Sequence, residues 1–115
     1  MKLSSQQKEA FERDGFLVLP PISETVSQNI ENWANEVKNL PHRPDAWMHY
    51  EEVNSAGERI LSRTENYADY HQGFNSLFRG PQMTEILETL TGEPMVLFKE
   101  KINFKGSCLN CRHCN

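Results

Sequence analysis

Apolar residues recur at helical spacing in four segments, which we predict to be helices over residues 4–14, 23–40, 69–78 and 81–91. In the first, Ser4 and Gln7 match a capping box, and Gly15 supplies a left-handed residue after the last turn. Ser23 or Thr25 caps the second. Its apolar stripe follows the spacing i, i+3, i+4 and i+7 through Ile30, Trp33, Ala34 and Val37.

Apolar and aromatic runs between the predicted helices indicate strands. The run Phe16-Leu17-Val18-Leu19 predicts a short buried strand that ends at Pro20-Pro21. Two further strands are predicted over residues 46–50 and 59–65. Helices and strands in this order indicate an α+β fold.

The longest predicted strand covers residues 94–105. Alternate side chains of a strand point to opposite faces, so one face carries three ammonium groups and an amide from Lys99, Lys101, Asn103 and Lys105. The other face is apolar apart from Glu100 and holds Phe98, Ile102 and Phe104. A solvated edge strand explains this pattern, because lysines at an edge deter aggregation. The alternative is a face that binds an anion.

Composition restricts the chain to a single small domain of the ordinary folded class. It has 115 residues and a formal charge of -4, which disfavours non-specific binding to nucleic acid. Hydrophobic residues make up 37%, and the mean hydropathy is -0.67, so we expect a thin core. No apolar run suits a membrane span or a signal peptide, which indicates a cytoplasmic protein.

Three stretches in this order resemble the N-terminal portion of the phytanoyl-CoA dioxygenase family. The first is Asp14-Gly15-Phe16-Leu17-Val18-Leu19-Pro20, after a helix. The second is the helix end over residues 87–94, which closes with Gly92-Glu93-Pro94. The third is the strand over residues 97–105, with the ending Asn103-Phe104-Lys105. The resemblance covers residues 1–105 and leaves residues 106–115 as an unrelated Cys-rich tail.

This resemblance implies an oxidoreductase that uses Fe(II), 2-oxoglutarate and O2 to hydroxylate or oxidise a small molecule, for example in secondary metabolism. It implies a double-stranded β-helix (jelly-roll) fold, of which this chain holds the N-terminal helices and the first core strand. It further implies that Lys105 contacts 2-oxoglutarate and that Lys99, Lys101 and Asn103 contact the substrate.

The iron ligands of that family are missing from the sequence. No His-x-Asp pair occurs, and His49-Tyr50-Glu51, the one His-x-Glu pair, lies before the long strand instead of after it. We therefore expect a C-terminally truncated dioxygenase that is inactive alone. A regulatory isoform that pairs with a full-length homologue is an alternative.

Two further groups of residues are open to interpretation. The polar side chains Arg63, Glu65, Asn66 and His71 could wall a substrate cavity or form a surface network. Trp33 and Phe74 are predicted to be core residues, whereas the pattern leaves Trp47 undecided.

The tail contains all three cysteines of the chain, which are Cys108, Cys111 and Cys114. With His113 they offer four soft ligands, so a non-catalytic metal-binding or interaction protein is a second hypothesis. His113 and Cys114 are adjacent, however, and no second pair closes a zinc knuckle. An intron read through, or a misplaced gene boundary, would produce the same abrupt change after Lys105.

Overall fold

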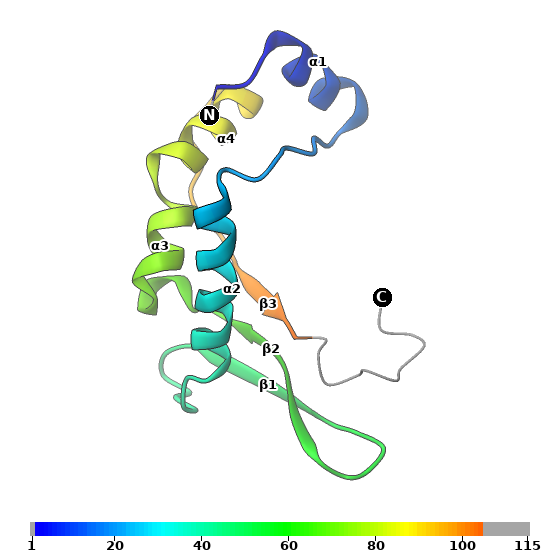
Figure 1. The fold of residues 1–115 in the computed structure, drawn as a ribbon, viewed down its shortest axis with the longest axis vertical. Coiled ribbons are helices and arrows are strands. Elements are labelled where there is room, and N and C mark those ends of the chain that lie inside the picture. The colour runs from blue at the N-terminus through cyan, green and yellow to red at the C-terminus, as the bar shows by residue number, and fades with distance from the viewer. Residues whose placement is uncertain (1, 105–115) are drawn as a thin grey trace.

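The computed structural model describes residues 2–104. In chain order, the elements are α1 (Ser5–Asp14), α2 (Glu24–Lys38), β1 (Met48–Val53), β2 (Arg59–Glu65), the 3-10 helix η1 (Ala68–Tyr70), α3 (Gln72–Phe78), α4 (Pro81–Thr91) and β3 (Lys101–Asn103) (Figure 1). An α+β fold is confirmed. The tail and Lys105 lie outside the described residues.

Helix ends lie where the sequence predicts them. Ser4 and Gln7 form the reciprocal capping box of α1, and the Ser23 hydroxyl accepts a hydrogen bond from the Val26 amide at the start of α2. Gly15 and Gly92 end α1 and α4 with φ angles of 81° and 82°, which only glycine adopts without strain.

The sheet has three antiparallel strands in the order β1-β2-β3. β2 has the predicted bounds. β1 begins at Met48, two residues later than predicted, because Ala46 and Trp47 are buried in the turn before it. Trp47 is therefore a core residue, and its indole Nε1 donates a 2.7 Å hydrogen bond to the Pro41 carbonyl. A jelly-roll barrel is not seen in residues 2–104.

The prediction of a long strand over residues 94–105 is wrong in its length. Only residues 101–103 form a strand, because only they pair with β2. Residues 94–100 run without regular structure, and no other described strand lies beside them. Phe98, predicted for the apolar face, is 96% exposed.

Two shorter predictions also need correction. Residues 16–19 do not form a strand, and Phe16 and Val18 are 63% and 82% exposed, because no described element covers them. The helix predicted over residues 69–78 is divided at His71, whose extended backbone separates η1 from α3. The His71 imidazole then caps α3 by accepting a hydrogen bond from the Phe74 amide.

A small core lies between the sheet and the helices α2 and α3, which run side by side in Figure 1. The predicted core positions Trp33 and Phe74 are confirmed, with ring centroids 5.6 Å apart in an edge-on arrangement. Gly73 allows this approach, because a Cβ at that position would overlap the Trp33 ring, with Cδ2 only 2.7 Å away. The buried cluster consists of Val37, Ala46, Trp47, Tyr67 and Phe74.

The molecule is elongated. Its extents are 52 × 34 × 25 Å, with α1 and α4 at one end and the β1–β2 hairpin toward the other (Figure 1). The radius of gyration is 17.0 Å, whereas a compact domain of this size has about 13 Å. Much apolar surface consequently stays uncovered, including Val96, which is 90% exposed.

Candidate functional site

The two faces of the sheet differ: one packs on the helical core, and the other carries charged side chains. In the packed face, Thr64 of β2 lies opposite Ile102 of β3, and Ile102 packs against the core. The neighbouring positions point the other way. There Arg63 lies opposite Asn103, and Glu65 lies opposite Lys101. We call this second surface the polar face; its members are Tyr50, Arg63, Glu65, Lys99, Lys101 and Asn103.

Glu65 is the centre of the polar face. Its side chain is nearly buried, and Oε2 accepts a 2.7 Å hydrogen bond from Arg63 Nε while Oε1 lies 3.2 Å from Lys99 Nζ. Burial alone would raise the pKa of this carboxyl. The hydrogen bonds and charges of Lys99 and Arg63 outweigh burial and hold the pKa of Glu65 below its ordinary value.

Arg63 is fixed from a second side by Tyr50. The guanidinium carbon lies 4.2 Å from the centre of the Tyr50 ring, within cation–π distance. Tyr50 lies opposite Arg63 in the β1–β2 register. The guanidinium is therefore held between an aromatic face and a carboxylate, which reduces the conformational freedom of a long side chain.

The predicted substrate-contacting residues share this surface. Lys101 and Asn103 are exposed at alternate positions of β3, and no carboxylate within residues 2–104 forms an ion pair with Lys101. Lys99 reaches the same surface through Glu65, although its backbone is not in a strand. Lys105, the predicted 2-oxoglutarate contact, lies outside the described residues.

Glu100 interrupts the alternating pattern for a structural reason. Its Oε1 accepts a 2.9 Å hydrogen bond from the buried Ala68 amide, so it ties the segment before β3 to η1. Burial and the neighbouring charge of Glu100 raise the pKa of Tyr67 to about 12. Tyr67 therefore stays protonated at neutral pH and acts as a core residue.

The predicted polar cluster of Arg63, Glu65, Asn66 and His71 does not form as one site. Only Arg63 and Glu65 meet. Asn66 has a positive φ of 59° and donates to the Ala46 carbonyl, which shapes the turn after β2. His71 is part of the helical layer, where its Nε2 lies 2.6 Å from Oε2 of Glu36 in α2.

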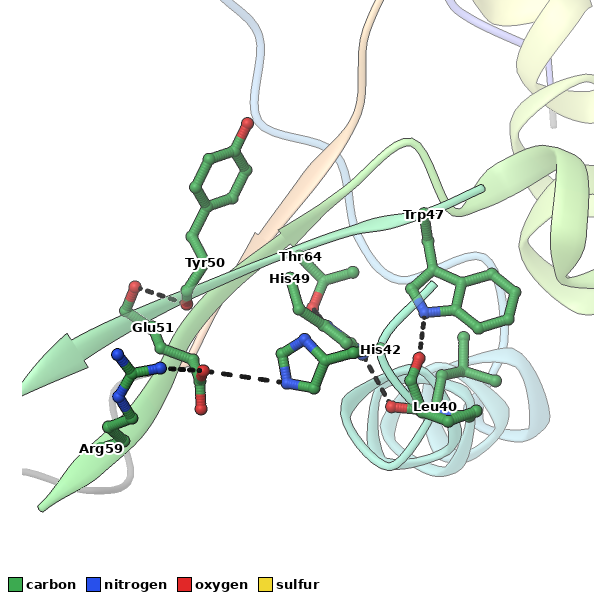
Figure 2. Close-up of polar contacts among 10 residues, drawn as sticks. Leu40, His42, Trp47, His49, Tyr50, Glu51, Arg59 and Thr64 are labelled. Atoms are coloured by element: carbon green, nitrogen blue, oxygen red, sulfur yellow. Dashed lines mark hydrogen bonds and ion pairs between the residues drawn. The ribbon is translucent and has the colours of Figure 1, made fainter. Parts of the chain in front are cut away.

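His49 has a structural role, and the His-x-Glu spacing of His49 and Glu51 does not produce a metal site. Its Nε2 donates to the Leu40 carbonyl at 2.8 Å, and its Nδ1 lies 2.6 Å from the buried Thr64 hydroxyl (Figure 2). Glu51 instead lies near His42 and Arg59, at 3.8 and 3.6 Å. Within residues 2–104, no three side chains of the metal-binding types are arranged to hold an ion.

A cavity of about 680 Å³ lies between α4 and residues 95–101. Its wall is largely apolar, with Met83 and Leu87 of α4 facing Val96 and Phe98. Three charged members of the wall have partners: Arg79 binds Asp69, Glu100 binds the Ala68 amide, and Lys99 pairs with Glu65. Lys101, the fourth, forms no ion pair within residues 2–104. Lys99 and Lys101 belong both to this wall and to the polar face, so the apolar cavity and the charged surface share these two residues.

The sequence pattern did not point to Tyr50 as a member of the polar face, or to Glu65 as its centre. One signal was available for Glu65. Arg63 and Glu65 are two positions apart in the strand predicted over residues 59–65, which places them on one face. Tyr50 needed the β1–β2 register, which depends on a bulge between Tyr50 and Glu51.

Comparison with known proteins finds oxygenases. The chain is 39% identical over 104 residues to a 2-aminoethylphosphonate dioxygenase of the uncultured bacterium HF130_AEPn_1. It is similar to dioxygenases. It is also 34% identical to a methylphosphonate hydroxylase of Gimesia maris and 28% identical to the dioxygenase lolE1 of Epichloe uncinata. No protein-family profile and no solved structure matches.

The matches cover nearly all of this chain but less than half of each relative. They include 89–90% of the chain and 40–41% of the relatives' length. The chain thus spans about 40% of the curated relatives that it matches. None of the helices in residues 2–104 is both long and apolar enough to cross a membrane.

Proposed function

We propose that this chain supplies the N-terminal portion of an Fe(II)- and 2-oxoglutarate-dependent oxygenase that acts on a small phosphonate. The observation that carries this proposal is the similarity of almost the whole chain to three oxygenases, two of which are named for phosphonates. The first of them is 39% identical over 104 residues.

The polar face is our candidate for the wall of the active site. Its members Lys99, Lys101 and Asn103 are the substrate contacts that we propose, and Lys105 is the proposed contact to 2-oxoglutarate. An ammonium group next to a phosphonate or a dicarboxylate forms a charge-assisted hydrogen bond, roughly twice as strong as a neutral one. Helices cover the other face of the sheet, so the polar face is the side on which a substrate could lie.

Residues 2–104 do not provide a set of iron ligands. In our proposal, the two histidines and one carboxylate that hold Fe(II) belong to the part of the oxygenase that corresponds to the other 60% of the relatives. The iron, when bound, supplies the oxygen chemistry. The chain described here binds and orients the substrate, and we expect it to be inactive alone.

A chimera tests the proposal. Residues 1–104 of this chain would replace the matching segment of the 2-aminoethylphosphonate dioxygenase. We expect this chimera to consume 2-oxoglutarate with Fe(II), and to do so faster when 2-aminoethylphosphonate is present. The parent dioxygenase and the 115-residue chain are the positive and negative controls. A folded, iron-loaded chimera without substrate-stimulated consumption would contradict the proposal.

A further inference from the structure

We propose that Arg63 and Lys99, positioned by Glu65 and Tyr50, form a two-cation anchor that binds the phosphonate group of the substrate. The inference rests on the proposed function for the identity of the ligand. It adds Tyr50 of β1 to the site, and it joins Arg63 of β2 to Lys99 of the segment before β3, two residues that the sequence analysis placed in separate groups.

The first argument is the geometry of the contacts that Arg63 and Lys99 make with Glu65. Arg63 contacts this carboxylate through Nε at 2.7 Å, and no described residue accepts a hydrogen bond from its two terminal nitrogens. Lys99 contacts the other carboxylate oxygen at 3.2 Å with one ammonium group that has three donors. Each cation thus makes one contact with Glu65 and keeps further hydrogen-bond donors for a ligand.

The second argument is charge. The polar face carries the cations Arg63, Lys99 and Lys101, and Glu65 is the carboxylate that pairs with two of them. This leaves two positive charges without a counter-charge on the face, in a chain whose overall formal charge is -4. A phosphonate dianion supplies the missing charge, as a phosphate group with a charge of about -1.5 to -2 does in other proteins.

The third argument is rigidity. Tyr50 lies against one side of the Arg63 guanidinium at 4.2 Å, and Glu65 is nearly buried beneath it. A planar guanidinium in a fixed orientation suits the paired oxygens of a phosphonate, because its donors form a rigid fork. Part of the entropy cost of ordering the arginine is therefore met before the ligand binds.

The test measures phosphonate binding by the 115-residue chain, with methylphosphonate as the probe and no iron or 2-oxoglutarate present. Backbone amide NMR signals would be followed during the titration. We expect Arg63→Gln to weaken binding about ten-fold, which corresponds to the loss of one hydrogen-bonded charge. Arg63→Lys, which keeps the charge, should recover part of this loss.

Arg59→Gln is the matched control. Arg59 lies in the same strand, has the same charge and pairs with Glu51 toward the hairpin, away from Glu65. Its removal should leave methylphosphonate affinity within about two-fold of the wild-type value, because it changes net charge but not the anchor. The amide spectrum of each variant reports whether it is folded.

Equal losses for Arg59→Gln and Arg63→Gln would overturn the inference, because binding would then follow net charge. Unchanged affinity in folded Arg63→Gln would overturn it as well. Neither outcome depends on turnover, so an active chimera combined with phosphonate binding that ignores Arg63 would reject the anchor and retain the proposed function. Binding that requires Arg63, together with an inactive chimera, would retain the anchor and reject the proposed function.

Discussion

Every buried polar side-chain atom within residues 2–104 has a hydrogen-bond partner. The pair of His49 and Thr64 is the clearest case, because His49 of β1 contacts both Thr64 of β2 and the carbonyl of Leu40, just after α2. The Leu40 carbonyl can only accept, so His49 Nε2 carries a proton, and Nδ1 accepts from the Thr64 hydroxyl when the ring is neutral. His49 therefore serves the fold, despite its His-x-Glu spacing.

Replacing Thr64 by valine should destabilise the fold. The substitution keeps the shape of a fully buried side chain but removes the donor to His49. We expect a loss of about 1–3 kcal/mol in the free energy of unfolding, measured by urea denaturation. Thr25→Val, at an exposed position of α2, is the matched control and should change stability by less than about 0.5 kcal/mol. Equal losses in the two variants would refute a special role for the Thr64 hydroxyl.

Glu65 makes stability depend on pH. Its pKa in the folded chain lies below the ordinary value of 4.5, so the ionised form stabilises the fold above pH 4.5. That contribution is lost as the pH falls through the folded pKa. We expect Glu65→Gln to be less stable than wild type at neutral pH, and the difference to narrow in acid. Urea denaturation at neutral and at acid pH measures the free energy of unfolding of Glu65→Gln and of wild type. Thr25→Val, which removes no ionisable group, should show no such narrowing.

At the level of elements, local signals predicted the helices well. A capping box, a serine cap and glycines after the last turn act within a few residues, so Ser4, Ser23, Gly15 and Gly92 could be assigned from sequence. Strand ends depend on a partner far away in the chain. Residues 94–100 have the strand pattern but no described neighbour, and only residues 101–103 reach β2.

The same limit applies to the candidate site. Alternation placed Lys101 and Asn103 on one face, and the β2–β3 pairing agrees with it. The contacts of Glu65 with Lys99, and of Tyr50 with Arg63, join residues from different strands or segments. Such contacts depend on register, which a local pattern does not determine.

The packing of α2 on α3 depends on Gly73. A methyl group there would overlap the Trp33 ring, so Gly73→Ala should cost about 1–3 kcal/mol in the free energy of unfolding. In an exposed helix, the same change would stabilise by about 0.5–1 kcal/mol. Thermal and urea denaturation show whether Gly73→Ala lowers or raises the free energy of unfolding. Ser76→Ala in the same helix, at an exposed position, should be close to neutral. A stabilised Gly73→Ala variant would show that the helices can separate at no cost.

At the scale of the whole molecule, the described residues leave large apolar groups uncovered. Val18, Val96 and Phe98 are 82%, 90% and 96% exposed, and the radius of gyration exceeds that of a compact domain. The thin core expected from composition agrees with this picture. In our account, the segment that corresponds to the remainder of the relatives would cover these groups and supply the iron ligands.

The central claim is that the polar face of the sheet lines an oxygenase active site. The most direct test is the KM for 2-aminoethylphosphonate in the chimera, compared between Lys101→Gln on the polar face and Lys38→Gln on the helical side. We expect Lys101→Gln to raise this KM about ten-fold, because it removes one charge-assisted contact, and Lys38→Gln to leave it unchanged. An unchanged KM in Lys101→Gln, or an equal rise in both variants, would contradict the account.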